Sequence, residues 1–321
     1  MTYKQLAREQ RYQIYALMKA GLSQAVIARI IGVHKSTISR EMRRNRGLRG
    51  YRPKQAHCFA AYRRAKAAKP RISSETWSLV VSLLRRDWSP EQISGWLAKE
   101  YRIRVSHESI YLFILKNKRQ GGNLHLHLRC RRKRRKRYGS TNSRGQLVNR
   151  VSIEERPAIV ETRSRIGDWE LDTIIGKGHK QALVSLTERK SRLTLLSKVK
   201  QKSADLVARS VQNLLEPIAS RVLTLTSDNG KEFAKHQEIS SVLQADFYFT
   251  HPYSAWERGL NENTNGLVRQ YFPQKHDFTT ITDNDVHMVM NKLNNRPRKC
   301  LGFKTPNEVF FGIKSTVALV T

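Results

Sequence analysis

The apolar pattern of this 321-residue chain changes near residue 151. Before that point, apolar residues recur at the three- and four-residue spacing of helices. After it, short β-branched or alternating runs predict strands. The first three runs follow one another, as in an antiparallel meander, and the later ones alternate with helices. We therefore expect a multidomain chain in which all-α N-terminal domains precede an α/β core with a mixed sheet.

Residues 1–47 are expected to form a helix-turn-helix domain. Ser23 suits the N-cap of its second helix, Gly32 suits the turn, and Ile38 places the third helix against a core. The outward face of that third helix is basic, which favours DNA reading over a plain three-helix bundle. The residues expected to contact DNA from this helix are Lys35, Ser36, Ser39, Arg40, Arg43 and Arg44.

A second helix-turn-helix-like domain is predicted at residues 73–117. Ser89 and Pro90 have the residue types of an N-cap and a first helical position, and Ser106 can cap the following helix. Two such readers would point to duplex DNA rather than RNA.

Two basic segments connect these domains to each other and to the rest of the chain. Residues 48–72 are expected to form a basic linker, with a basic helix along phosphates as the alternative, and residues 118–150 a basic flexible arm. Eight of the nine residues from 129 to 137 are Lys or Arg, and a block of this density favours the DNA backbone. The arm residues expected to bind phosphates are Arg131, Arg132, Lys133, Arg134 and Arg135.

The charge balance supports a polyanionic partner. The chain has 60 Lys and Arg against 26 Asp and Glu, a net charge of +34, which nucleic acid would neutralise. No apolar run approaches the roughly 20 residues of a membrane span, so no membrane partner is expected. Three scattered cysteines without a secretory leader favour a reducing cytoplasm.

Acidic residues occur in three notable places of this basic chain. Strand parity puts Asp168, Glu170 and Asp172 on one face, and parity alone lets Glu170 compete with Asp172 as the functional acid. Asp228 follows a buried strand, where sites of open α/β sheets gather. Glu262 lies in a predicted helix. Three converging carboxylates would repel one another unless cations neutralised them, and two Mg²⁺ ions are a recurring solution in nucleases.

The surroundings of Glu262 leave alternatives open. Asn265 and Arg269 share its helix face, where they are expected to contact DNA. Glu262 could instead be a solvated helix residue or form an ion pair with Arg258 at the i, i+4 spacing. The Asp-Asn-Gly sequence at Asp228 could instead form a hairpin turn.

These motifs together resemble a known family. The order Asp172, Asp228, Glu262, with 33 residues between the last two, and the sequences DNGKEF, GLNENTN and HPYSAWERG resemble the DDE transposases and retroviral-type integrases, which have a ribonuclease H-like core. With the leading helix-turn-helix, nearly the whole chain resembles a bacterial transposase of the insertion sequence thirty family.

The resemblance implies a catalytic core at residues 151–315, with Asp172, Asp228 and Glu262 as catalytic residues that bind two Mg²⁺ ions, for which Mn²⁺ can substitute. It implies binding of double-stranded DNA at terminal inverted repeats, strand cleavage and transfer into target DNA, and circular intermediates. It further implies a homo-oligomer on DNA and a cytoplasmic, nucleoid-associated location in a bacterium.

Two other functions are compatible with parts of the sequence. A helix-turn-helix repressor with an oligomerising second domain would explain the N-terminal region, but it has no need of three gathered carboxylates. An RNA-cleaving nuclease of the same core fold would explain the carboxylates, but not the two predicted duplex readers.

Overall fold

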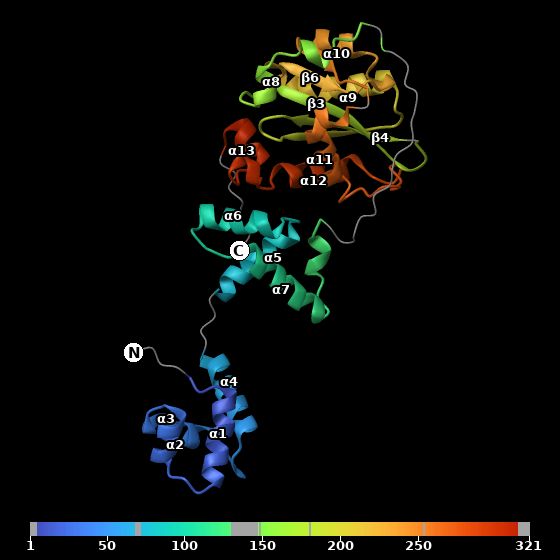
Figure 1. Ribbon diagram of the computed structural model, residues 1–321. Coiled ribbons are helices and arrows are strands. Elements are labelled where there is room, and N and C mark those ends of the chain that lie inside the picture. The colour runs from blue at the N-terminus through green and yellow to red at the C-terminus, as the bar shows by residue number, and fades with distance from the viewer. Residues whose placement is uncertain are drawn as a thin grey trace. The chain divides into compact units, whose positions relative to one another are not determined.

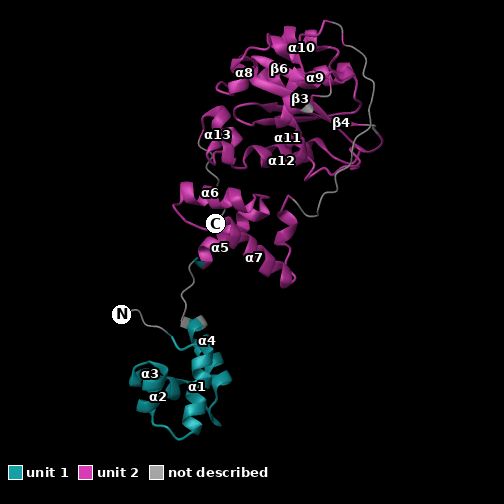
Figure 2. Ribbon diagram, in the orientation of Figure 1, with its two compact units in different colours: residues 1–73 teal, residues 74–321 magenta. Residues whose placement is uncertain are grey.

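The chain divides into two compact units, residues 1–73 and residues 74–321 (Figures 1 and 2). The structure, a computed structural model, describes residues 5–67, 72–129, 147, 149–179, 181–252 and 254–313. Across these described ranges, no helix is both long and apolar enough to cross a membrane.

The first unit contains the predicted helix-turn-helix. Ser23 caps the second helix through the Val26 N–H (3.5 Å), and Gly32 ends it with a φ of 72°. The third helix carries Ile38 into the core and begins at Lys35, so the predicted helix-turn-helix is confirmed. The helices of the unit are α1 (Arg8–Lys19), α2 (Gln24–Ile31), α3 (Lys35–Asn45) and α4 (Pro53–Ala67), and a short hairpin joins β1 (Arg46–Gly47) to β2 (Gly50–Tyr51).

Helix α4 extends the first unit beyond the predicted three helices. Its Ala56 is fully buried in the same cluster as Ile14, Ile27 and Ile38 of the other helices. The hairpin and α4 occupy most of the segment 48–72, which was expected to be a linker. This segment is therefore largely a packed part of the first unit.

An ion pair joins α1 to α3 inside this unit. Arg11 Nε lies 2.7 Å from Glu41 Oε1 and Arg11 Nη2 lies 3.2 Å from Glu41 Oε2, with side-chain exposures of 4% and 7%. The Tyr51 hydroxyl also donates to Glu41 Oε1 at 3.2 Å. This buried contact fixes the third helix against the first.

The second unit begins with three helices, α5 (Ser74–Arg85), α6 (Pro90–Glu100) and α7 (His107–Arg119), followed by the short η1 (Leu124–His127). The predicted caps are confirmed, since Ser89 accepts from the Gln92 N–H and Ser106 from the Ser109 N–H. Leu124 is buried, so the first residues of the expected arm at 118–150 are structured.

A five-stranded mixed sheet forms the centre of the second unit, in the order β5-β4-β3-β6-β7. The pairs β3–β4 and β4–β5 are antiparallel, as the predicted meander requires, whereas β3–β6 and β6–β7 are parallel. This is the expected ribonuclease H-like core. Its strands are β3 (Asp168–Ile175), β4 (Ala182–Glu188), β5 (Thr194–Val199), β6 (Thr224–Ser227) and β7 (Asp246–Phe249).

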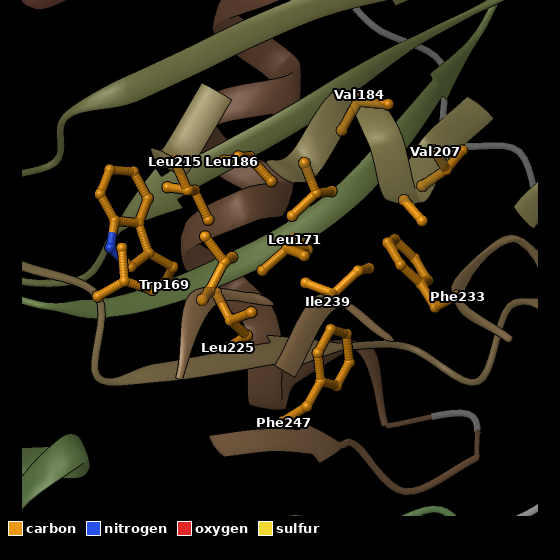
Figure 3. Close-up of a cluster of buried hydrophobic side chains, with 14 of the residues drawn as sticks. Trp169, Leu171, Val184, Leu186, Val207, Leu215, Leu225, Phe233, Ile239 and Phe247 are labelled. Carbon is orange, nitrogen blue, oxygen red and sulfur yellow. The ribbon is translucent and has the colours of Figure 1, made fainter. Parts of the chain in front are cut away.

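Helices cover both faces of this sheet. On one face, Trp169 and Leu171 of β3 pack with residues of α9 (Ala204–Leu215) and α10 (His236–Leu243) in the cluster drawn in Figure 3. On the other face, Ile174 packs with α11 (Gly259–Val268) and α12 (Asp283–Asn294). The alternation along β3 thus agrees with the predicted strand parity, and the acids of β3 lie on the α11 side.

The remaining elements are short and lie between these strands and helices. They are η2 (Ile153–Glu155), α8 (Ile159–Thr162), η3 (Lys177–His179), η4 (Glu216–Arg221), η5 (Lys231–Phe233), η6 (Ala255–Arg258), η7 (Lys299–Leu301) and α13 (Pro306–Phe311).

Asp87, between α5 and α6, ties the helical part of the second unit to the sheet part. Its carboxylate accepts hydrogen bonds from Lys292 of α12 (2.9 Å) and from the Tyr271 hydroxyl (3.2 Å), and it contacts His127 Nδ1 (2.9 Å). Burial raises the pKa of Asp87, but the hydrogen bonds from Lys292 and His127 outweigh it and bring this pKa below its ordinary value.

Candidate active site

Two of the three acids on β3 are buried in ion pairs. Asp168 is fully buried and accepts hydrogen bonds from Arg165 Nη2 (2.9 Å) and the Thr224 hydroxyl (2.8 Å). Glu170 is also buried and accepts from Arg189 Nη1 at 2.7 Å. Burial raises the pKa of Glu170, and the charge of Arg189 offsets part of that rise. Both carboxylates therefore have structural partners.

Glu170 also holds helix α11 against the sheet. Its Oε2 accepts the backbone N–H of Asn261, in the first turn of α11, at 3.0 Å. N–H groups at a helix N-terminus lack intrahelical acceptors and carry partial positive charge, so a carboxylate stabilises them. These contacts give Glu170 a structural role, whereas the side chain of Asp172 is 24% exposed.

Asp172 receives hydrogen bonds on both carboxylate oxygens. The Thr173 N–H donates to Oδ1 at 2.8 Å, and the Asn265 side-chain amide donates to Oδ2 at 2.7 Å. Burial raises the pKa of Asp172, the nearby Asp228 raises it further, and the Arg258 guanidinium opposes both. The middle of β3 and the nearby Asp228 therefore concentrate negative charge in a poorly hydrated place.

Asp228 follows the last residue of β6, on the strand next to β3. Its Oδ1 accepts the Gly230 N–H at 3.0 Å, and its side chain is 20% exposed. Because β6 pairs in parallel with both neighbours, the Asp-Asn-Gly sequence does not form a hairpin turn. The prediction that Asp228 stands at the end of a buried strand is confirmed.

Arg258 lies between the two aspartates. Its Nη1 donates to the Leu171 carbonyl at 2.7 Å and lies 3.7 Å from Asp172 Oδ1, while its Nη2 lies 3.4 Å from Asp228 Oδ2. Its side chain is only 10% exposed. A shared guanidinium reduces the repulsion between the two carboxylates.

Glu262 lies on the exposed side of α11, three positions before Asn265. Arg258 is directed to the two aspartates rather than to Glu262 four positions later. No group of three or more Asp, Glu, His or Cys side chains that could hold a metal ion occurs within the described parts of the chain. The structure thus brings Asp172 and Asp228 together and leaves the Glu262 carboxylate outside the pair.

The oxygen atoms around Asp172 and Asp228 have the chemistry that a hard divalent cation requires. Besides the carboxylates of Asp172 and Asp228, the side-chain oxygen of Asn265 is buried and has no hydrogen-bond partner among the residues that the structure describes. Carboxylate and amide oxygens are the preferred protein ligands of such cations. The residues therefore fit a metal site, with Asn265 as an additional oxygen donor.

Two residues near this site have contacts that the local sequence does not reveal. The i, i+4 spacing indicates Glu262 as the partner of Arg258, and no local pattern singles out Glu232. Glu232 is buried, accepts from the Thr173 hydroxyl at 3.0 Å and pairs with Lys202 at 2.7 Å. No local pattern could have found these contacts, because they join residues 30 or more positions apart.

Comparison with known sequences places the chain in a family. It is 44% identical over 311 residues to the transposase for insertion sequence element IS4351 of Bacteroides fragilis, which covers 96% of this chain and 95% of that protein. It is 37% identical over 319 residues to transposase InsI for element IS30A of Escherichia coli K12, covering 95% and 82%. The chain belongs to the IS30 family of transposases.

Other comparisons concern parts of this transposase. Residues 2–45 match a helix-turn-helix domain family, and residues 37–114 match a homeodomain-like domain family. Among solved structures, the catalytic core domain of BIV integrase aligns with 45% of this chain and 93% of its own length, at 22% identity and a TM-score of 0.37. The HTLV-2 integrase catalytic core, in complex with magnesium, aligns with 46% and 97%, at 20% identity and a TM-score of 0.37.

The family membership decides between the function classes considered from the sequence. The transposase relatives align with both the helix-turn-helix region and the mixed-sheet core, so a repressor with a non-catalytic second domain is not favoured. The protein is a DNA transposase, a polynucleotidyl transferase that binds DNA.

The residues predicted to contact DNA have different environments. On α3, Ser36 is partly buried and contacts His34 Nδ1 at 2.8 Å, whereas the other five predicted residues are exposed. Arg269 donates to the Ile175 carbonyl at 2.7 Å and lies over the Phe278 ring, so it is bonded within the protein. The exposed α3 residues are Lys35, Ser39, Arg40, Arg43 and Arg44. The predicted arm residues Arg131, Arg132, Lys133, Arg134 and Arg135 lie outside the described residues.

Proposed function

We propose that this transposase cleaves and joins DNA strands at a divalent-metal site formed by Asp172, Asp228 and Glu262. The observation that carries the proposal is the 2.7 Å hydrogen bond from Asn265 to Asp172. Asn265 lies on α11, three positions after Glu262, so this bond attaches the helix that carries Glu262 to the middle of β3, where Asp172 lies. Asp228 follows the neighbouring strand, β6.

Two Mg²⁺ ions, for which Mn²⁺ can substitute, are the cofactors we propose for these three carboxylates. When bound, such ions activate an attacking oxygen and stabilise the leaving 3′ oxygen. The chain's own residues prepare this chemistry. Asn265 orients Asp172, and Arg258 holds the middle of β3 through the Leu171 carbonyl while it lowers the repulsion between the aspartates.

We further propose distinct DNA contacts for the other parts of the chain. The exposed face of α3 would read the terminal inverted repeats of the element, with Arg40 at its centre. The basic arm at residues 131–135, with Asn265 and Arg269 beside the site, would contact the DNA backbone of the element end or the target. Because two element ends must be joined to one target, the active form would be a homo-oligomer on DNA, in the bacterial cytoplasm at the nucleoid.

The test of the metal site is Glu262→Gln in the full-length protein. Glutamine keeps the size of the side chain and its helix propensity but removes the charge that Mg²⁺ needs from its ligand. We expect binding to duplexes that carry the element ends to persist, and strand cleavage and joining in Mg²⁺ to fall by several orders of magnitude.

Glu238→Gln is the matched control, because Glu238 is a half-exposed helix residue of α10 whose partner is Lys235 at the surface. It should cleave like the wild type. A Glu262→Gln protein that cleaves element ends at more than a few per cent of the wild-type rate would show that Glu262 is not a metal ligand.

A further inference from the structure

A pocket lined by arginines lies against α11. It has a volume of about 270 Å³ and is formed by Arg163 after α8, Arg192 between β4 and β5, Arg298 before η7, and apolar and polar residues of α11. A second pocket of about 440 Å³ shares Arg163 and Arg192 and adds two lysines, Lys190 and Lys304. No Asp or Glu lines either pocket.

The positive charge of this arginine pocket is only partly balanced by the described protein, because the nearby Glu170 attracts Arg163 and Arg192 but is itself paired with Arg189. None of the three arginines forms an ion pair with a carboxylate among the residues that the structure describes, and Nε of Arg192 and of Arg298 is buried there without an acceptor. Burial lowers the pKa of Arg298 to about 10, and the charge of Arg296 contributes. Burial and the charge of Arg163 likewise lower the pKa of Arg192. Partly buried cations that repel one another destabilise a fold unless an anion neutralises them.

The arginine pocket and the candidate metal site lie on different sides of the same helix. Leu260, Asn263 and Leu267 line the pocket at helical spacing, whereas Glu262 and Asn265 lie on the other side of α11. A helix is roughly 10 Å across, and successive phosphates of one duplex strand advance about 3.4 Å along the axis. A phosphate in the pocket would thus belong to a nucleotide roughly three positions from the one at Glu262.

Arg129 bridges the surface between these two sides. Its Nη1 lies 3.5 Å from Asn263 Oδ1. A Cβ atom added to Gly266 would lie 2.8 Å from Arg129 Nη2. The glycine therefore permits a guanidinium to lie directly on α11. Positive charge extends from the pocket across the exposed surface of the helix toward Glu262.

We propose that Arg163, Arg192 and Arg298 bind a backbone phosphate of DNA a few nucleotides from the bond that is cut, an inference that rests on the proposed function. Guanidinium groups bind phosphate oxygens through paired, charge-assisted hydrogen bonds. The lining contains no aromatic ring on which a base could stack, so it fits the sugar-phosphate backbone and not a nucleobase. The phosphate belongs either to the element end or to the target, and both carry the same chemistry.

The experiment compares full-length wild type with Arg163→Gln/Arg192→Gln. Binding is measured against salt concentration on two duplexes of equal length, one with the element's terminal repeat and one unrelated. Loss of one phosphate contact should reduce the slope of log K against log salt by about 0.9 and weaken binding about tenfold at low salt. If the slope falls only on the duplex with the terminal repeat, the bound phosphate belongs to the element end. If the slope falls on both duplexes, the pocket binds the DNA backbone regardless of sequence.

Two controls separate a bound phosphate from a general charge effect. Arg209→Gln removes an exposed arginine of α9, on the opposite face of the sheet, and should leave the slope unchanged. Arg192→Lys keeps the charge and should keep the slope. If the double variant has the wild-type slope, or if Arg209→Gln changes it equally, the proposal is overturned.

Failure of this proposal can be distinguished from failure of the metal site. A wild type that cleaves in Mg²⁺, with a double variant of unchanged slope, refutes only the arginine pocket. Arg163→Gln alone provides a second variant if the double variant unfolds, because the Arg163 side chain is exposed and bonded to none of the described residues. It too should lower the slope.

Discussion

The ion pair between Arg11 and Glu41 offers the sharpest test of how the first unit supports DNA reading. We expect Glu41→Gln to destabilise this unit by about 3–5 kcal/mol, the cost of leaving one member of a buried pair without its partner. The side chains are only 4% and 7% exposed, so solvent screens their interaction little. Glutamine can accept one hydrogen bond from Arg11, but its NH₂ group would face another donor, Nη2, which now lies 3.2 Å from Glu41 Oε2.

This loss is large relative to the stability of the unit. A unit of 73 residues has a stability of about 4–11 kcal/mol, at about 0.05–0.15 kcal/mol per residue. Hydrogen exchange of the α1 and α3 amides in the full-length protein measures the change, and binding to element ends should weaken in parallel. Glu9→Gln, on the exposed side of α1, should cost less than 0.5 kcal/mol.

The double variant Arg11→Met/Glu41→Met tests the reason for the loss. Replacing both members of a buried pair by apolar residues is often neutral, so this variant should be more stable than Glu41→Gln. If Glu41→Gln costs less than about 1 kcal/mol, the buried charge of Arg11 finds compensation elsewhere, and the reasoning is wrong.

Four further predictions concern single residues. Asp87→Asn should weaken the junction between helices and sheet by about 1–3 kcal/mol, since a charged acceptor for Lys292 is lost, and exchange of α12 amides would reveal it. Folding lowers the pKa of Asp87 from its ordinary value of 3.8, so the ionised carboxylate stabilises the fold fully above pH 3.8. This stabilisation is lost as the pH falls through the pKa of Asp87 in the folded protein, and hydrogen exchange of the α12 amides measured against pH would show the loss. Gly95→Ala should lower the melting temperature despite a gain of about 1 kcal/mol in helix propensity, because its Cβ would overlap the Phe303 ring. Arg40→Ala should weaken binding to element ends by about 1–3 kcal/mol and relax base preference, measurable by footprinting on mutated repeats.

Local signals in the sequence were sufficient for helix ends and strand faces. Ser89 and Ser106 cap helices, and Asp168, Glu170 and Asp172 share a face, because caps and alternation depend on neighbouring residues. The position of β6 beside β3 could not be predicted, since it depends on pairing between segments more than 50 residues apart. No local rule encodes that choice.

Helix α4 illustrates a different limit. Its segment is basic and has no continuous apolar stripe, so the sequence left a basic helix and a linker open. The structure shows that Pro53 and the small Ala56 are buried there, and that Ala56 belongs to the core cluster of the first unit. The sequence does not reveal that this helix packs, because a basic outer face is compatible with both a packed helix and a solvated segment.

The acids of β3 show why alternation alone does not single out the carboxylate to which we assign the metal. Asp168, Glu170 and Asp172 point to the same side, but the first two are neutralised by Arg165 and Arg189. Arg165 lies in the loop before β3 and Arg189 directly after β4. Folding is what brings Arg189 next to Glu170. Asp172 lacks a dedicated arginine of this kind and shares Arg258 with Asp228.

The contacts on either side of Glu262 hold its backbone to β3 in a fixed register. Glu170 accepts the N–H of Asn261, one residue before Glu262, and Asp172 accepts the amide of Asn265, three residues after it. The two acceptors are themselves two residues apart on one strand face. Helix α11 is therefore anchored at both of these points, and the metal site that we propose requires the Glu262 carboxylate to approach Asp172 and Asp228 from this anchored helix. The two glutamates thus differ: the buried Glu170 sets where the helix lies, and the exposed Glu262 is the one to which we assign the metal.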